Sequence, residues 1–339
     1  MKGEEVMIIV IGGSSFIGVY TVKQLVEAGY EVLATGRNAK FDAYYKAQNI
    51  PYINFDLTVK SDFNKLPKEN VEGVILLSGL LPANATVNIN VDENAEDYIK
   101  VNTLGTINVL EFCRRNNIRR LISTTSYAEV LNALKKDVPI TEDEPKDFLH
   151  RDDHAAYVIS KIAASELMEY YNQQHGMKNA IFRLPPVYGV GPHGGLYING
   201  TYKKSGLQIF IEKSMAGEDI QVFGDKDVSR DVVYVKDVAD AFVKAIRSEN
   251  TYGLYNITSG RSVSLAEQAR AVAKVFACDG KESKVVYKPE MQNNSLSYVF
   301  DISKANRDFV YKPQYADFEV MMKDYKKEME RDVFGKLFE

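Results

Sequence analysis

Short apolar segments alternate with longer amphipathic ones through the first half of the chain. The apolar segments span residues 6–11, 31–35, 52–57, 74–78, 120–126 and 179–183. Apolar positions recur at helical spacing over 16–28, within 92–117, and from about Asp153 to His175. Strands separated by helix-length crossovers form βαβ units and therefore a parallel sheet. Because the strands are apolar almost throughout, we expect helices to cover both faces of the sheet.

A stretch rich in proline and glycine, at residues 185–192, ends this alternation. The segments after it are shorter, more irregular and rich in Gly, Tyr and Lys. Within them, a strand and helix over 231–247 and a strand at 254–258 are expected to extend the first sheet. The pattern predicts a large domain formed by residues 1–184 and 225–258. A smaller α/β substrate-binding domain is expected from residues 185–224 and 259–339.

The composition narrows the classes of protein that fit this pattern. The 339 residues are 45% apolar and 26% charged, which are ordinary values for a soluble globular chain. There are 42 basic and 46 acidic residues, so no basic excess favours binding to nucleic acid. The apolar run at 6–11 is too short to span a membrane and leads straight into Gly12, so no membrane association is expected.

The cysteines and histidines fit a reduced protein without a metal. Cys113 and Cys278 are far apart in the sequence and lack metal-ligand spacing, and the four histidines form no ligand motif. We therefore expect a cytoplasmic protein that has no metal site.

A glycine-rich turn connects the first predicted strand to the first predicted helix. Residues 12–18 read Gly-Gly-Ser-Ser-Phe-Ile-Gly. Such a turn brings backbone N–H groups and a helix N-terminus to one point, where they can hold a pyrophosphate. Gly12 permits the tight turn, and Gly18 lets the helix pack closely on the strand. The turn therefore predicts a Rossmann-type, doubly wound parallel sheet that binds NAD(P).

The end of the second strand is expected to face the adenosine ribose of this cofactor. An acidic residue there would accept hydrogen bonds from the ribose hydroxyls and repel a 2′-phosphate. The chain instead has Arg37 and Lys40, which could pair with that phosphate, so NADP is slightly favoured over NAD. Arg37 could also stack on the adenine or be a solvated loop charge. Asp56, at the end of the third strand, is expected to meet the adenine amino group.

Tyr157 and Lys161 lie four residues apart on the long predicted helix, so their side chains share one face. A free tyrosine has a pKa of about 10 and is a poor base near neutral pH. A neighbouring ammonium and a positive nicotinamide ring would lower that pKa. Ser126, or alternatively Thr125 or Thr124, ends the fifth strand and could hold a reacting oxygen near the tyrosine. Tyr157 could then take a proton from a substrate hydroxyl while hydride leaves the same carbon.

Together these motifs resemble the short-chain dehydrogenase/reductase superfamily, specifically its extended branch, the NAD-dependent epimerase/dehydratase family. Further matching segments run through nearly the whole chain, at residues 101–110, 183–192, 222–239, 255–257 and 301–305. The resemblance implies an epimerase or reductase of the nucleotide-sugar type that uses NAD(P). It also implies a homodimer that is formed through the helices within 92–117 and 153–175.

The resemblance assigns roles to individual residues. Tyr157 is the acid/base, and Lys161 lowers its pKa and holds the nicotinamide ribose. Ser126 or Thr125 is the hydroxyl partner, and Asn102 helps to build the catalytic cavity. The residues expected to line the cofactor site are Gly12, Ser14, Ser15, Phe16, Ile17, Gly18, Arg37, Lys40, Asp56, Leu57, Ser78, Gly79, Tyr157, Lys161, Pro185 and Val187.

Two departures from the family pattern concern the chemistry. Ser15 stands at the middle glycine of the turn, where its side chain could tighten or reshape the pyrophosphate site. Tyr127 and Ala128 follow Ser126 where the family's sugar dehydratases carry Asp-Glu. Because water loss needs that additional acid and base, a 4,6-dehydratase is disfavoured.

Two further departures concern the substrate. Arg230 matches the arginine that contacts substrate phosphate in nucleotide-sugar enzymes, but a second such arginine is replaced by Lys288, a less bidentate group. Pro186 stands where many of those enzymes have an asparagine. Two alternatives are therefore an NADP-dependent ketoreductase for a non-nucleotide substrate and a non-catalytic NAD(P)-sensing protein. Such sensors characteristically lose the Tyr–Lys pair, which this chain keeps.

Overall fold

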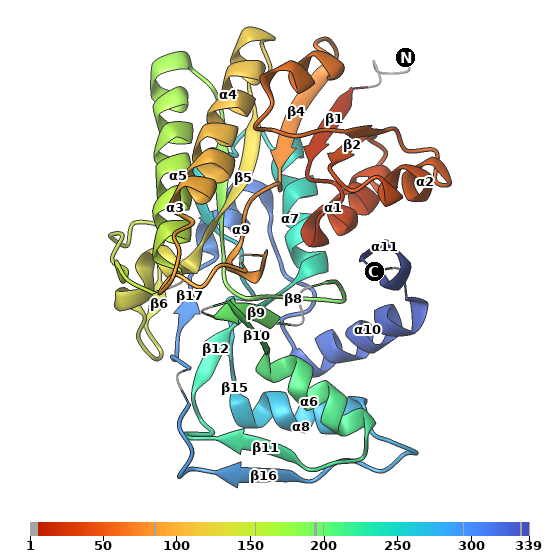
Figure 1. Ribbon diagram of the computed structural model, residues 1–339, viewed down its shortest axis with the longest axis vertical. Helices are drawn as coiled ribbons and strands as arrows, with labels where there is room; N and C mark the ends of the chain where they lie inside the picture. Colours follow the sequence, from red (N-terminus) through yellow and green to blue (C-terminus); the bar gives the residue numbers. More distant parts are fainter. Residues whose placement is uncertain are drawn as a thin grey trace.

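A seven-stranded parallel sheet forms one half of the molecule, the upper part of Figure 1. The computed structural model describes residues 6–84, 86–152, 154–192, 195–198, 200–293, 295–332 and 334–338. In spatial order the strands are β14 (Gly253–Asn256), β7 (Ala180–Leu184), β5 (Leu121–Ser126), β4 (Val71–Leu76), β1 (Met7–Ile11), β2 (Glu31–Gly36) and β3 (Tyr52–Asn54). Every neighbouring pair runs parallel. The predicted Rossmann-type sheet is confirmed, and β14 extends it as expected. The strand expected at the start of residues 231–247 does not join this sheet, because Ser229–Asp231 pairs with Ser262–Ser264 and Val233–Tyr234 pairs with Val187–Tyr188.

Helices cover both faces of this sheet, as the apolar strands predicted. The four long ones are α1 (Phe16–Glu27), α4 (Gly105–Arg115), α5 (Ala155–His175) and α7 (Val235–Arg247). Alternate residues of β1 enter two different core clusters. Ile8 belongs to the cluster that includes α1 and α7, whereas Ile9 belongs to the cluster that includes α4 and α5. The strand is therefore apolar at every buried position because it has no solvent-facing side.

Short strand pairs and helices build the rest of the molecule. The pairs are β8 (Val187–Tyr188) with β13 (Val233–Tyr234), β9 (Gly195–Ile198) with β10 (Thr201–Lys204), β11 (Ile220–Phe223) with β16 (Val285–Lys288), β12 (Ser229–Asp231) with β15 (Ser262–Ser264), and β6 (Pro139–Ile140) with β17 (Val299–Phe300). The helices are α6 (Gly206–Met215), α8 (Leu265–Val275), α9 (Ser303–Phe309), α10 (Phe318–Arg331) and α11 (Gly335–Phe338).

The end of the chain returns to the large sheet, and α11 lies close to α1 in Figure 1. The ring of Phe334 packs on that of Tyr20 in α1, with centroids 5.4 Å apart. The amide of Asn38, which follows β2, donates to the carbonyl of Leu337 at 3.1 Å. The division into two domains stays a prediction, and this last segment contacts the half that was assigned to the cofactor.

Several segments differ from the sequence prediction. The third strand ends at Asn54 instead of residue 57, because the chain turns where the Asp56 amide donates to the Asp62 carboxylate at 2.8 Å. The helical region within 92–117 consists of α3 (Ala95–Tyr98), a π-helical segment (Ile99–Leu104) and α4. Helix α2 (Lys40–Lys46) was not predicted. The predicted start of the long helix at Asp153 lies outside the described residues. Within the described ranges, we find no helix that combines the length and the apolar character needed to cross a membrane.

Candidate functional site

The carboxyl ends of β1 and β4 mark the point at which the winding of the sheet reverses. Strands β2 and β3 lie on one side of β1, and β5, β7 and β14 lie beyond β4 on the other. Doubly wound sheets bind ligands in the crevice outside these strand ends. Ser78 follows β4 here, and its amide donates to the carbonyl of Ile11 at 3.0 Å. The glycine turn and Ser78 therefore meet at the expected ligand crevice.

The backbone of the turn requires glycine at two positions. Gly12 has a φ of +93°, and a Cβ there would lie 2.4 Å from the amide nitrogen of Ser78. A Cβ on Gly18 would lie 2.0 Å from the carbonyl oxygen of Gly12. These contacts exclude larger residues and hold the start of α1 against the strand end. The turn fits the cradle that the pyrophosphate of NAD(P) needs.

Ser15 forms the N-cap of α1. Its hydroxyl accepts a hydrogen bond from the amide of Gly18 at 3.1 Å, which satisfies one of the free amides of the first helical turn. The replacement of the middle glycine therefore reshapes the turn by capping the helix. Among the neighbouring predicted contacts, Phe16 is buried and Ile17 is half-buried, while Ser14 hydrogen-bonds the Tyr52 side chain.

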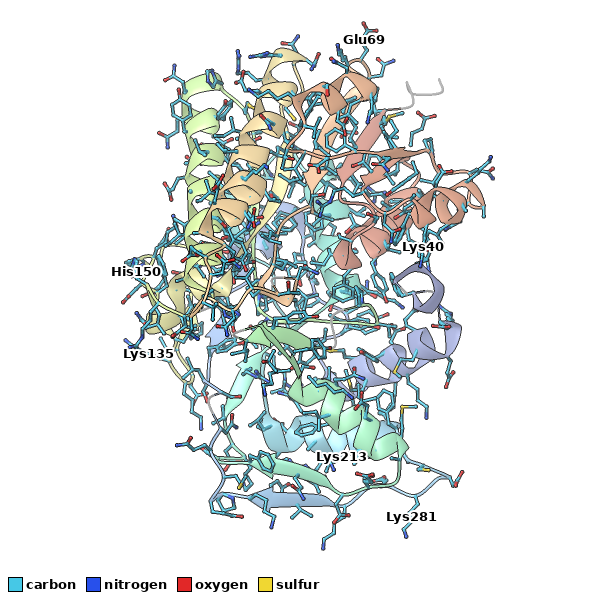
Figure 2. All side chains as sticks on the ribbon, in the orientation of Figure 1. Lys40, Glu69, Lys135, His150, Lys213 and Lys281 are labelled. Carbon is cyan, nitrogen blue, oxygen red and sulfur yellow. The ribbon has the colours of Figure 1, made fainter. Side chains whose placement is uncertain are left out.

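Arg37 and Asp56 face each other just after the ends of β2 and β3, where the adenosine of the cofactor is expected. A guanidinium nitrogen of Arg37 lies 3.8 Å from a carboxylate oxygen of Asp56, and the arginine side chain is 76% exposed. The other Asp56 oxygen accepts hydrogen bonds from the amide and hydroxyl of Thr58 at 2.8 and 2.7 Å. Lys40 begins α2 and is exposed on the surface (Figure 2). Leu57 is buried, with its side chain packed against α4.

Tyr157 lies in the first turn of α5, and its phenol interacts with the side chain of Ser126, the last residue of β5. Side chains alternate along a strand, so Thr125 projects to the opposite side. There its hydroxyl donates to the Glu129 carboxylate at 2.8 Å. The structure therefore brings Ser126, and not Thr125, to the tyrosine. Thr124 lies two residues before Ser126, so its side chain projects to the same side of the strand, and it is half-buried.

Burial raises the pKa of the Tyr157 phenol in the protein alone, the interaction with Ser126 opposes the rise, and the neighbouring Tyr98 and Glu129 add to it. Burial also lowers the pKa of Lys161 to about 8, against the opposing effect of the Glu129 carboxylate. Desolvation is therefore the largest influence on both groups in the protein alone. The lowering expected from the ammonium together with a bound nicotinamide stays a prediction.

Asn102 connects the site to a neighbouring loop. It lies in the π-helical segment, a geometry that often marks functional sites. Its side-chain oxygen accepts from the Leu80 amide at 2.8 Å, and its nitrogen donates to the Ser160 hydroxyl at 3.0 Å. That hydroxyl donates to the carbonyl of Tyr157 at 2.7 Å. Asn102 therefore anchors the turn of α5 that carries Tyr157, and Gly79 lies beside it.

Arg230 and Tyr127 both line a pocket of about 370 Å³, and Tyr127 directly follows Ser126 in the sequence. The Nε atom of Arg230 is buried and has no hydrogen-bond partner among the described residues. The rings of Tyr127 and Tyr298 stack with centroids 5.4 Å apart and line the same pocket together with Asn293. Both tyrosines were missed as site residues in the sequence, because nothing local to Tyr298 shows that its ring stacks on Tyr127, the residue after β5.

The remaining predicted contacts lie in separate places. Pro185 is buried after β7, and Val187 is half-buried in β8, where it pairs with Val233. Lys288 ends β16, and its strand pairs with β11. It does not line the Arg230 pocket, so the structure does not bring the two predicted substrate residues together.

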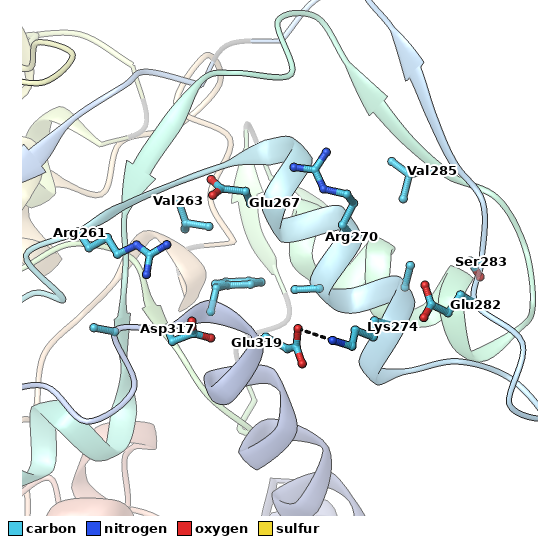
Figure 3. Close-up of a pocket in the computed structure, with 14 residues that line it drawn as sticks. Arg261, Val263, Glu267, Arg270, Lys274, Glu282, Ser283, Val285, Asp317 and Glu319 are labelled. Carbon is cyan, nitrogen blue, oxygen red and sulfur yellow. Dashed lines mark hydrogen bonds and ion pairs between the residues drawn. The ribbon is translucent and has the colours of Figure 1, made fainter.

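A second pocket lies between α8, β16 and the start of α10 (Figure 3). Its volume is about 350 Å³. Charged side chains of both signs surround it, and Lys274 pairs with Glu319 at 2.9 Å. It contains none of the predicted site residues, so we place the candidate site at the switch point instead.

Comparison with known proteins agrees with this architecture. The family model of the NAD dependent epimerase/dehydratase family matches residues 8–258. A provisionally named UDP-glucose 4-epimerase of Methanocaldococcus jannaschii is 29% identical over 88% of this chain and 91% of its own. The UDP-glucose 4-epimerase of Mycolicibacterium smegmatis is 26% identical over 91% of this chain and 94% of its own. The solved UDP-glucose 4-epimerase of Thermus thermophilus in complex with NAD superposes with a TM-score of 0.74 at 23% identity, covering 97% of this chain and 100% of that one.

Proposed function

Because the chain belongs to the NAD-dependent epimerase/dehydratase family, we propose that it is an NAD(P)-dependent nucleotide-sugar 4-epimerase or oxidoreductase. The observation that carries the proposal is that Tyr157 meets Ser126 at the carboxyl end of β5, with β4 between that strand end and the glycine turn after β1. This arrangement supports proton transfer at a carbinol carbon held next to the cofactor.

The chain's own residues divide the work of such a reaction. When bound, the nicotinamide accepts a hydride from the substrate carbon and can return it. Tyr157 takes the proton of the substrate hydroxyl, and Ser126 holds that hydroxyl at hydrogen-bond distance. Lys161 favours the phenolate by its charge when it is protonated. Asn102 keeps this part of α5 in place through Ser160.

A nucleotide-sugar substrate is supported by Arg230 and by the names of the relatives. Arg230 is half-buried and lines a pocket together with Tyr127, where a substrate phosphate could pair with its guanidinium. Proton abstraction beside a ketone would need a further acid and base. Glu129 is the nearest carboxylate in the sequence, but it is buried in an ion pair with Arg183 at 2.7 Å. A 4,6-dehydratase is therefore disfavoured.

Incubation with UDP-galactose or UDP-glucose and each oxidised cofactor tests the proposal. A 4-epimerase interconverts the two sugars, which proton NMR of the anomeric signals detects. Cofactor that stays bound through purification favours the epimerase, and readily exchanged cofactor favours a reductase. A protein that binds cofactor but turns over no carbonyl or carbinol substrate would contradict the proposal and support a sensor.

Arg37 is expected to make the protein prefer NADP(H) over NAD(H). Its exposed guanidinium can pair with a 2′-phosphate, and Asp56 at 3.8 Å helps to orient it. Hydrogen bonds to charged groups contribute about 1.5–3 kcal/mol, so Arg37→Asp should weaken NADPH binding by about 10- to 100-fold and reverse the preference. Calorimetric titration with both cofactors measures this, with Lys46→Asp on α2 as the matched charge control. Tighter binding of NAD(H) by the unmodified protein would refute the prediction.

A homodimer is expected through the outer faces of α4 and α5. Ile159 and Tyr170 are 42% and 53% exposed, and eleven residues are close to three helical turns, so both lie on one face of α5. Leu104, at the start of α4, is 51% exposed. Light scattering at micromolar concentration should give the mass of a dimer, and Tyr170→Glu should give a monomer. Val320→Glu on α10 is the control, and a monomeric unmodified protein would contradict the prediction.

A further inference from the structure

Glu129 and Arg183 form a buried ion pair directly behind the end of β5. Both side chains are 1% exposed, and the arginine Nε lies 2.7 Å from a Glu129 oxygen. The guanidinium also donates to the carbonyl of Thr141 at 3.2 Å and to the side-chain oxygen of Asn256 at 3.1 Å. Burying two charges is costly, and a hydrophobic pair of similar size is often at least as stable. The pair therefore invites a functional explanation.

The ion pair is connected to the strand end that carries Ser126. Residues 127–133 form a 3-10 turn, η4 (Tyr127–Ala133), which Ser126 caps by accepting the Ala128 amide at 3.2 Å. Glu129 lies in the first turn of η4 and accepts the hydroxyl of Thr125 at 2.8 Å. The two neighbouring hydroxyls are thus held on opposite sides of the strand. The hydrogen bond with Glu129 holds Thr125 on one side of the strand, so Ser126 faces Tyr157 on the other side.

The carboxylate also acts on the two catalytic candidates by its charge. The groups that act on Tyr157 are Ser126 from β5, Tyr98 from α3, and Tyr127 and Glu129 from η4. For Lys161, burial favours the neutral amine and the Glu129 charge favours the ammonium. Arg183 from β7 pairs with the same carboxylate through its Nε atom at 2.7 Å.

We propose that Glu129 is a positioning residue of the active site, which holds Thr125 on one side of the end of β5 and leaves Ser126 facing Tyr157. The carboxylate is held in place by Arg183, and its charge also favours the ammonium form of Lys161. The inference rests on the proposed function of the Tyr157–Lys161 pair. Glu129 neither touches the substrate nor exchanges a proton in the reaction. It acts through the residues that do.

The charge is tested by titrating Lys161 in protein labelled with ¹³C at lysine Cε. The Lys161 signal is identified by its loss in Lys161→Arg. Glu129→Gln keeps an oxygen that can accept a hydrogen bond but loses the charge, so the pKa of Lys161 should fall by on the order of one unit. Glu129→Asp should restore most of it. Glu142→Gln is the matched control, because Glu142 accepts the Asn256 amide at 2.8 Å on the opposite side of the network.

An unchanged Lys161 pKa in folded Glu129→Gln, or an equal fall in Glu142→Gln, would overturn the charge assignment. The positional role is tested by Thr125→Val, which removes one hydrogen bond and no charge. We expect kcat to fall about 3- to 10-fold with cofactor affinity unchanged, since a hydrogen bond contributes about 1 kcal/mol. A normal kcat would refute that role. If the unmodified protein converts no nucleotide sugar, the proposed function fails, and the lysine titration still decides the charge assignment.

Discussion

Replacing Tyr157 by phenylalanine is expected to slow turnover by about 10²- to 10⁴-fold, the usual contribution of a positioned acid/base group. The change removes only the hydroxyl that faces Ser126. The ring keeps its edge-to-face contact with Tyr98, whose centroid lies 6.0 Å away, so the fold should be preserved. Steady-state kcat and a calorimetric titration with the cofactor measure the two effects separately.

Tyr170→Phe is the matched control for this experiment. It removes a hydroxyl from an exposed tyrosine on the same helix, away from the strand end. It should leave turnover unchanged. Turnover of Tyr157→Phe within a few-fold of the unmodified protein would overturn the assignment of the acid/base and leave only the fold and cofactor site.

Lys161→Met is expected to weaken cofactor binding and slow turnover, yet to make the protein more stable near pH 7. Burial lowers the pKa of Lys161 from 10.5 to about 8, so the buried ammonium disfavours the folded state at neutral pH. Between pH 8 and 10.5 Lys161 binds more protons in the unfolded chain than in the folded protein. The free energy of unfolding of the unmodified protein should therefore rise with pH relative to that of the variant. At pH 7 the free energy of unfolding of Lys161→Met should exceed that of the unmodified protein by at most about 3 kcal/mol.

Denaturant unfolding at pH 7 and pH 10, compared between Lys161→Met and the unmodified protein, measures the sign of this difference. Cofactor titration provides the second readout. The arginine of Lys161→Arg stays charged at both pH values. Residue 161 should therefore add little pH dependence to the stability of that variant. A Lys161→Met protein that is less stable at pH 7 and binds cofactor normally would show that the lysine has a purely structural role.

The central sheet could be predicted from the sequence because its strands carry their own signal. The residues around Ile8 and Ile9 are buried on both faces, so the apolar run is continuous and leads directly into the glycine turn. Helix α2 was missed because it is only seven residues long: Phe41, Tyr44 and Tyr45 are at helical spacing, but so short a segment does not establish a period. Its stability comes from packing of Tyr45, whose hydroxyl hydrogen-bonds the carbonyl of Gly13.

The register at the end of β5 could not be resolved from sequence, because three hydroxyl residues follow one another there. The choice depends on Glu129, which binds Thr125, and on Arg183, which lies 54 residues further along the chain. The rise in the pKa of Tyr157 in the protein alone could not be seen from the sequence for a related reason. Spacing places the ammonium on the same helix face, but only the tertiary structure shows how strongly burial penalises the phenolate.

The most direct test of the account follows the hydrogen at the reacting carbon. UDP-galactose deuterated at C4 is incubated with the protein and oxidised cofactor, and the product is analysed by NMR and mass spectrometry. The account predicts UDP-glucose that keeps its deuterium at C4, formed more slowly than from unlabelled substrate and at least 10²-fold more slowly by Tyr157→Phe. Product that has exchanged its deuterium with water, or formation that does not depend on Tyr157, would contradict hydride transfer with Tyr157 as the acid/base.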